Sequence, residues 1–185
     1  MIITKRYQRE NAVTYARTWA LSRNPLFVDF TGSGGDCTNF VSQCLLAGSC
    51  VMDYSDPFGW YYLSSNERAP AWAGVEFLFD FLTGSGDFPS NDARSGPFGR
   101  EVGMRQIQVG DVVQLAREGD FYHTLFVLGV EQNDILVAAH SDDALDRRLS
   151  TYNFDTLRFI HIDGVRVEIN EDDCFRALLD GIALP

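Results

Sequence analysis

A cysteine follows a glycine-rich turn at the predicted start of a helix, in the segment FTGSGGDCTNFVSQCLLAG. A helix N-terminus carries a partial positive charge and unpaired backbone N–H groups, and both stabilise the thiolate that attacks carbonyl carbons. The backbone N–H at this position also suits a developing oxyanion, and the glycines leave room for a substrate backbone. We therefore expect the Cys37 thiol to ionise readily and to act as a nucleophile. The alternative is a small buried residue that packs the start of a helix.

Two of the three histidines lie at facing positions of a predicted β-hairpin. His123 stands at the start of DFYHTLFVLGV, and His140 stands at the end of ILVAAHSDD. In a tight antiparallel hairpin the start of one strand lies beside the end of the next, which predicts that the two rings are near cross-strand neighbours. A nucleophilic cysteine needs a base, and the base needs an orienting group. We predict His123 as the base and His140 as the orienting group, with Asp142 as the alternative, whereas His161 is interpreted as structural or surface-exposed.

Four further residues are candidates for contact with a substrate. Gly35 and Asp36 directly precede the cysteine, and Asp36 is also expected to cap the helix with its carboxylate turned back onto the helix amides. Tyr122 flanks the predicted base. Trp60 belongs to an aromatic loop, and aromatic side chains gather at clefts, although packing in the core is the alternative for such rings.

Other chemistries are less well supported by the spacing of the reactive residues. The cysteine and the two histidines are legitimate zinc ligands, but no CxxC or HxxxH pair supports a metal site. No G-x-S-x-G elbow supports a serine hydrolase. The prediction is therefore an enzyme that needs neither metal nor cofactor. The alternatives are a non-catalytic binding module of the same fold, and a deamidase or acyl transferase that uses the same cysteine–histidine pair.

The elements that must position these residues change character along the chain. Apolar residues first recur at helical spacing and later form short runs bounded by turns. The predicted helices are 9–22, 37–48, 71–83 and 172–184. The predicted strands are 112–115, 121–130, 135–139, 157–162 and 165–169. Residues 84–105 are expected to form a long loop. Helices followed by antiparallel strands are typical of an α+β domain.

Composition limits the class of protein and its partners. The 185 residues suit one domain with a sizeable core, and we expect a single monomeric domain over residues 1–185. The formal net charge of −11 repels nucleic acid and anionic membranes, so neither is an expected partner, and it suits a cationic or neutral substrate. No apolar run is long enough to span a membrane, and the N-terminus lacks the apolar core of a signal peptide. The location is left open between the cytoplasm and another route of export.

The four cysteines do not suggest a disulfide framework. They are sparse for a chain of this length, at Cys37, Cys44, Cys50 and Cys174. The first two lie seven residues apart on one predicted helix, which separates their Cα atoms by about 10 Å. That distance is too large for a bridge between them.

Several segments together resemble a known family. These are GGDCTNFVSQCLLAG, WYY, VGDVVQL, YHTLFV and AAHSDD, and they are similar to the bacterial "putative amidase domain" family. That family is related to the NlpC-like and CHAP cysteine amidases of the papain-like group, and the resemblance spans residues 7 to 162. It implies a cysteine-bearing helix packed on an antiparallel sheet, with Cys37 as nucleophile, His123 as general base and His140 at the third polar position. It also implies hydrolysis of a peptide or amide bond through a thioester acyl-enzyme, with peptidoglycan as a candidate substrate.

Overall fold

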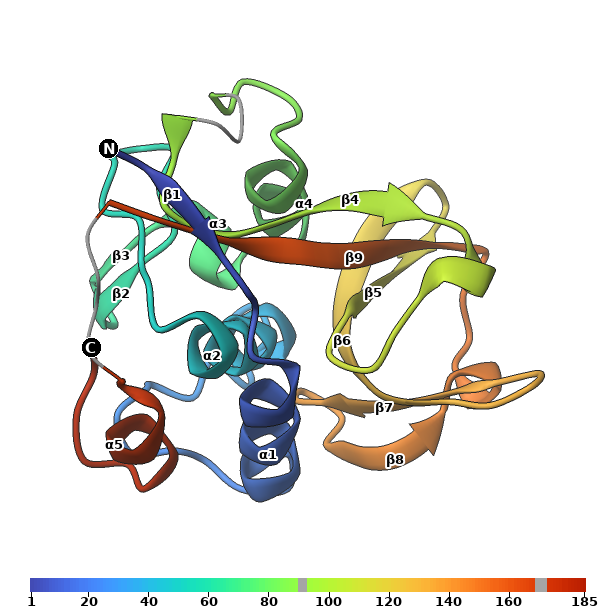
Figure 1. Ribbon diagram of the computed structural model, residues 1–185. Helices are drawn as coiled ribbons and strands as arrows, with labels where there is room; N and C mark the ends of the chain where they lie inside the picture. Colours follow the sequence, from blue (N-terminus) through green and yellow to red (C-terminus); the bar gives the residue numbers. More distant parts are fainter. Residues whose placement is uncertain (90–92, 169–172) are drawn as a thin grey trace.

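The computed structural model describes residues 1–89, 93–168 and 173–185. Within these ranges the chain is an α+β structure with one large antiparallel sheet and a few helices (Figure 1). The helices are α1 (Arg9–Trp19), α2 (Cys37–Ser49), α3 (Pro70–Ala73), α4 (Val75–Thr83) and α5 (Phe175–Leu179), with short 3₁₀ turns η2 (Met104–Gln106) and η3 (Leu149–Thr151). The strands are β1 (Ile3–Lys5), β2 (Tyr62–Ser64), β3 (Glu67–Arg68), β4 (Gly96–Val102), β5 (Val112–Arg117), β6 (Asp120–Val130), β7 (Ile135–Ala139), β8 (Ala144–Arg148) and β9 (Thr156–Val167). No helix in these ranges has both the length and the apolar character needed to cross a membrane.

The main sheet is organised around its longest strand, β9. The strand order is β1-β9-β5-β6-β7-β8, and β4 also pairs with β9. The second half of β9 lies between β1 and β4, and its first half lies between β4 and β5. Figure 1 shows the sheet curving from β4 and β9 at the top, through β5 and β6, to β7 and β8 at the bottom. Strands β2 and β3 form a separate hairpin.

Apolar side chains on the two faces of the sheet belong to two separate clusters. Along β6, Phe126 and Leu128 face the helices, whereas Leu125 and Val127 face the inside of the curved sheet. The first cluster joins the sheet to the helices. The second cluster lies within the curve and is formed by β5, β6, β7, β8 and β9. The same alternation puts Thr124 on the helix side of β6 and His123 on the opposite side, next to the start of α2 only at the end of the strand.

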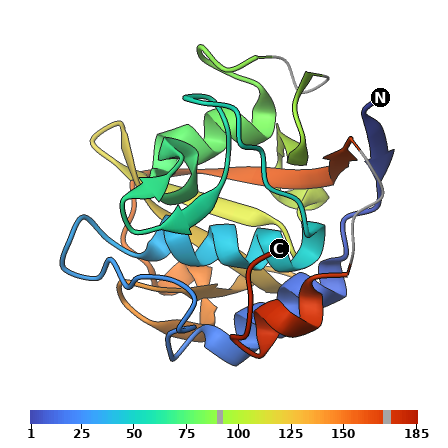
Figure 2. The same ribbon diagram turned by 90° about the vertical axis from the view of Figure 1, so that its left-hand side faces the viewer.

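Helix α2 is buried on every side. All of its residues from Cys37 to Ser49 are buried, because the sheet, α1, α3 and α5 surround it (Figures 1 and 2). The neighbours approach so closely that a Cβ atom at Gly48 would lie 2.3 Å from the Tyr7 ring. The periodicity predicts one buried apolar face, but the polar residues Ser42 and Gln43 are buried as well. In the structure Ser42 Oγ donates to the Trp72 carbonyl at 2.8 Å, and Gln43 Oε1 accepts from the Tyr15 hydroxyl at 2.8 Å.

Several elements differ from the sequence prediction for identifiable reasons. Strand β4 lies in the predicted loop 84–105, because its glycine- and proline-containing sequence lacks alternation but finds a partner in β9. The predicted turn at Asp163 and Gly164 is instead interior to β9, where Gly164 pairs with Phe98. The predicted helix 71–83 is divided at Gly74 into α3 and α4. Positions 90–92 of the predicted loop, 169 of the last predicted strand and 172 of the final predicted helix lie outside the described residues.

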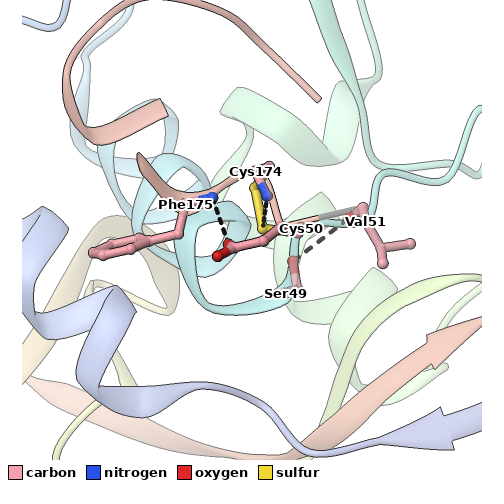
Figure 3. Close-up of a disulfide and its surroundings, with 6 residues drawn as sticks. Ser49, Cys50, Val51, Cys174 and Phe175 are labelled. Carbon is pink, nitrogen blue, oxygen red and sulfur yellow. Dashed lines mark hydrogen bonds between the residues drawn. A yellow bond between two sulfur atoms is a disulfide. The ribbon is translucent and has the colours of Figure 1, made fainter. Parts of the chain in front are cut away.

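A disulfide joins the C-terminal end of α2 to the segment that leads into α5 (Figure 3). Cys50 is the C-cap residue of α2 in the left-handed region, with φ of 54°, and its Cα lies 5.6 Å from that of Cys174. The Cys174 backbone N–H also points at the Cys50 sulfur, at 3.3 Å. The sequence prediction of no disulfide is therefore wrong for this pair. The cysteines lie 124 residues apart, so only the packing of the tail beside α2 brings them together.

Candidate active site

A pocket of about 380 Å³ opens where the N-terminal end of α2 meets β6. Its lining includes Cys37 from the helix, His123 from the strand and Gly35 from the turn before the helix. The volume lies within the range of binding sites for small molecules and short peptide segments, about 300–1,000 Å³. Two residues that are 86 positions apart in the chain thus share one cleft, as the sequence predicted.

A hydrogen bond between two threonines, supported by a glutamine, joins the start of α2 to β6. Thr38 Oγ1 lies 2.8 Å from Thr124 Oγ1, and Gln114 Nε2 donates both to Thr124 Oγ1 at 3.3 Å and to the Val75 carbonyl at 2.8 Å. Thr38 and Thr124 are the immediate neighbours of Cys37 and His123. The contact therefore sets the position of the sulfur along β6.

Burial dominates the electrostatics of the cysteine. The Cys37 side chain belongs to a residue that is only 7% exposed, and burial raises the pKa of its thiol. Hydrogen bonds from the Thr124 backbone and from Thr38 favour the thiolate and lower this pKa, but they do not offset the loss of solvation. The expectation of a readily ionised thiol is therefore wrong for the resting protein. Cys44, further along α2, is fully buried, and its pKa is raised well above the ordinary value.

The imidazole of His123 lies close to two tyrosine rings. The ring centroids of Tyr122 and Tyr152 lie 5.9 Å and 5.8 Å from that of His123, respectively. Burial lowers the pKa of His123 to about 4, with Asp142 acting to raise it and Arg147 to lower it. His123 is therefore neutral near pH 7 and can accept a proton.

His140 does not orient His123, contrary to the sequence prediction. Its Nδ1 lies 2.6 Å from Asp36 Oδ2, its Nε2 lies 2.8 Å from the Trp19 carbonyl, and its ring stacks on Phe40. The cause is the register of the hairpin. Phe126 pairs with Ala138, and continuing that register places His140 opposite Thr124, one residue away from His123. An offset of one residue puts two side chains on opposite faces of a sheet, so the rings point apart.

Asp36 is a structural partner of His140 rather than a cap or a substrate contact. The residue is fully buried, and its Oδ1 accepts hydrogen bonds from the Phe30 backbone N–H at 2.9 Å and from Asn39 Nδ2 at 2.8 Å. The carboxylate makes no capping hydrogen bond to the amides of α2. The Asp36 backbone N–H donates to Ser141 Oγ. Both predicted roles of Asp36 are therefore wrong, because its oxygens hold the glycine turn against the end of β7.

The other predicted contact residues fall into two groups. Trp60 is fully buried, donates from Nε1 to Ser42 Oγ at 3.0 Å and packs on Trp72, so the prediction that it contacts a substrate is wrong. Gly35 and Tyr122 line the pocket, and Tyr122 is 39% exposed. Their contact with a substrate stays a prediction.

The structure adds pocket residues that the sequence reading missed. They come from the end of β5, from the turn between β7 and β8, from β8 and from the turn after β8: Arg117, Ser141, Arg147, Thr151, Tyr152 and Asn153. Asp142, the alternative orienting group, also lines the pocket, but it accepts a hydrogen bond from Arg147 at 2.8 Å. Within the described ranges no residue makes a hydrogen bond to the His123 ring. Arg117 carried one available signal, since it lies two residues after the predicted strand 112–115 and six residues before the predicted base.

The residues considered as zinc ligands are not assembled into a site. Both nitrogens of His140 are engaged by Asp36 and Trp19, on the far side of the strand from His123. No three His, Cys, Asp or Glu side chains come together as a metal-binding group in the part of the chain that the structure describes. His161, interpreted from the sequence as structural or surface-exposed, bonds through Nδ1 to Asp111 Oδ2 at 2.8 Å.

The chain is similar to known proteins at the level of a family and of a curated relative. The chain is 27% identical over 150 residues to "Uncharacterized protein YhbB" of Bacillus subtilis (strain 168), an alignment that covers 75% of this chain and 42% of that protein. The chain thus spans less than half the length of this relative. No solved structure matches the chain significantly. The family described as "Putative amidase domain" matches residues 6–162, a stretch that includes Cys37 and His123, and the chain belongs to this family.

Proposed function

We propose that the protein is a cysteine-dependent amidase or peptidase of papain-like architecture. It hydrolyses an amide bond through a thioester formed on Cys37. The observation that carries this proposal is the shared pocket, in which a thiol at a helix start and a neutral imidazole on the adjoining strand line one cleft. Membership of an amidase family supports the same reaction class.

The proposed reaction begins with a neutral thiol and a neutral base. Burial keeps the proton on Cys37 and off His123 at pH 7, so no thiolate–imidazolium pair exists before substrate binds. His123 takes the thiol proton as sulfur attacks the carbonyl carbon, and the carbonyl π electrons move onto oxygen. The unpaired backbone N–H groups in the first turn of α2 favour the resulting oxyanion.

The intermediate then collapses in two further steps. The C–N bond breaks, His123 gives its proton to the leaving amine nitrogen, and the acyl group remains on sulfur as a thioester. Water next adds to the thioester carbonyl while His123 accepts one of its protons. The C–S bond breaks, and the proton returns to sulfur, which regenerates the thiol and releases a carboxylic acid.

The ring of His123 is held by packing rather than by a third polar side chain. The rings of Tyr122 and Tyr152 lie near it, and Asp142 contributes a favourable charge from within the pocket. Asp36 and His140 lie outside the group of residues that line the pocket and act indirectly. They hold the glycine turn that precedes Cys37, and they do not touch the reacting atoms.

Cell-wall peptide material is the proposed substrate source, since a pocket of this size and openness admits a peptide chain. The test is mass spectrometry of peptidoglycan fragments and simple peptides after incubation in H₂¹⁸O. A hydrolase places ¹⁸O in the new carboxylate, a transferase passes the acyl group to an amine, and a deamidase releases ammonia.

The Cys37→Ala variant tests the nucleophile directly. We expect hydrolysis to fall at least about 1,000-fold, with little change in the midpoint of thermal unfolding. Cys44→Ala is the matched control, because it removes a sulfur from the same helix outside the pocket, and its activity per folded molecule should be retained. Turnover by Cys37→Ala at the wild-type rate would reject the proposal. Iodoacetamide provides a second readout, since Cys37 should be alkylated faster than Cys44, which is fully enclosed.

A further inference from the structure

We infer that the pocket selects amides whose leaving amine carries a carboxylate, and that Arg117 binds that carboxylate. The inference rests on the proposed function, because it assigns the His123 side of the pocket to the leaving group. It names a substrate class: peptides cleaved so that an amino acid with a free α-carboxylate, or a residue with an acidic group near the amine, is released.

Arg117 is the unneutralised cation of the pocket. Its Nε donates to the Asn153 carbonyl at 2.9 Å, and its guanidinium lies 4.9 Å from the centroid of the Tyr122 ring. No carboxylate in the described ranges lies within ion-pair distance of it. Its two terminal nitrogens are therefore available to a ligand, and guanidinium geometry matches a carboxylate in a bidentate contact.

The second arginine of the pocket is already committed. Arg147 donates to Asp142 at 2.8 Å and to Thr151 through Nε and Nη2, and it covers the Tyr152 ring at 3.7 Å. The charges of Arg147 and Asp142 cancel, and burial keeps His123 neutral at pH 7. The lining thus retains one positive charge, that of Arg117, in a chain whose formal net charge is −11.

Two parts of the pocket lining differ in a way that bears on the direction of the substrate. Gly34 and Gly35, in the turn before Cys37, carry no side chain to contact a ligand. Tyr122 and Tyr152 lie beside His123, and an arginine lies over the ring of each tyrosine. His123 must deliver its proton to the leaving amine, so the groups that flank it face the leaving part of the substrate.

This placement reverses the expectation from overall charge. The net charge of the chain favours cationic or neutral substrates at long range, but contact selectivity depends on the groups within reach of the bond. A carboxylate on the leaving amine would meet Arg117, whereas a cationic leaving group would be repelled by it. Hydrogen bonds to a charged group in this setting correspond to about 10- to 100-fold in rate or affinity.

The experiment uses a library of N-acetylated tripeptides prepared as matched pairs, each with a free C-terminal carboxylate or with a C-terminal carboxamide. Mass spectrometry follows the release of the last residue by the wild-type protein, by Arg117→Gln and by Arg148→Gln. Arg148 is a matched control, because it is an exposed arginine on β8 that pairs with Glu131 and does not line the pocket.

The wild-type protein should consume the acids about 10- to 100-fold faster than the amides, and about 1 M salt should weaken this preference. Arg117→Gln should bring the two rates within about twofold, chiefly by slowing the acids, and Arg148→Gln should keep both the rates and the preference. Cys37-dependent cleavage with no acid preference, or a preference that survives in Arg117→Gln, overturns the inference and leaves the proposed function standing.

A binding measurement separates the two proposals if the library is not cleaved. The Cys37→Ala variant is incubated with the same peptides, and bound species are recovered by rapid filtration. The single variant should retain more of the acids than of the amides, and the double variant Cys37→Ala/Arg117→Gln should retain both equally. This result supports the carboxylate site even if the chain is a binding module. Equal recovery of acids and amides overturns it.

Discussion

The two ends of α2 carry cysteines with opposite fates. At the N-terminal end, Cys37 keeps a free thiol at a pocket, and the turn before it is held by hydrogen bonds of Asp36. At the C-terminal end, Cys50 is locked in a disulfide with Cys174. The same residue type thus remains a free thiol beside a pocket at one end of a buried helix and forms a covalent bridge at the other.

The difference follows from what each helix end offers. The N-terminal end presents unpaired N–H groups, which attract acceptors and developing negative charge, so a polar network and a nucleophile suit it. The C-terminal end presents carbonyl groups and a left-handed cap, which give a thiolate no stabilisation. The state of each cysteine therefore depends on its place on the helix and on its partner in space. We expect that the hydrogen bonds at one end and the disulfide at the other can be removed independently.

The largest expected effect comes from Asp36→Ala at the N-terminal end. This variant leaves the Phe30 N–H, Asn39 Nδ2 and His140 without their buried acceptor, which should lower the free energy of unfolding by about 3–5 kcal/mol. Denaturant titration measures the loss. Activity should fall with it, because the turn before Cys37 is released.

Asp36→Asn is the matched control for this prediction. Its Oδ1 can accept from Phe30 and Asn39, and its Nδ2 can donate to an unprotonated His140 Nδ1, so most of the stability should return. Equal loss in the alanine and asparagine variants would show that the hydrogen bonds are not what holds the turn.

The next effect tests the C-terminal end. Replacing both Cys50 and Cys174 by serine should lower the free energy of unfolding by about 2–4 kcal/mol, because the bridge closes a long loop in the unfolded chain. Turnover per folded molecule should change less than about twofold, since neither residue lines the pocket of Cys37. Treating the wild-type protein with a reductant should reproduce the loss. A matching loss of turnover in folded protein would contradict the independence of the two ends.

The smallest expected effect is a dependence of the free energy of unfolding on pH, which arises in the pocket at the N-terminal end of α2. His123 has a pKa of about 4 in the folded state and an ordinary value of 6.5, so the unfolded chain binds its proton first as pH falls. The contribution to stability is complete above pH 6.5, decreases as pH falls from there to about 4, and amounts to at most about 3 kcal/mol. Urea titrations across this range measure it. His123→Gln should flatten the slope, whereas the Cys50 and Cys174 double variant should keep it.

The proposed reaction makes turnover depend on the same titration. If His123 is the base, as proposed, it works in its neutral form, so activity should persist on the acid side to about pH 4–5 and fall below that. An acid limb near pH 6.5 would show that substrate binding or solvent restores the ordinary pKa of this histidine.

Local patterns predicted the parts of the fold that lie close together in sequence. Helix α2, its cysteine and the β6–β7 hairpin followed from periodicity and turns. The face of His140 did not, because one residue of register decides it and sequence arithmetic locates a hairpin centre only approximately. The partner of Asp36 was missed for the same reason.

Long-range pairing was beyond the sequence. Strand β4 exists because β9 offers an edge to it, and nothing in the segment GPFGREV alternates. The bridge between Cys50 and Cys174 depends on how the tail packs against α2. The position of the Arg117 side chain in the pocket depends on its contacts with Asn153 and Tyr122, which exist only in the folded chain. Each of these features depends on contacts between segments that are far apart in the chain, and local sequence patterns do not predict such contacts.

The position of β9 in the sheet has a consequence for how the chain is built. Strands β1, β4 and β5 all pair with residues 156–167, so none of these three can complete its pairing until that later segment has emerged from the ribosome. Until then the edges of β4 and β5 are open to wrong partners. Assembly of the sheet should therefore be a late, slow event dominated by contacts between distant segments. A nascent chain that stops before β9 should be a far better client for chaperones than the finished protein.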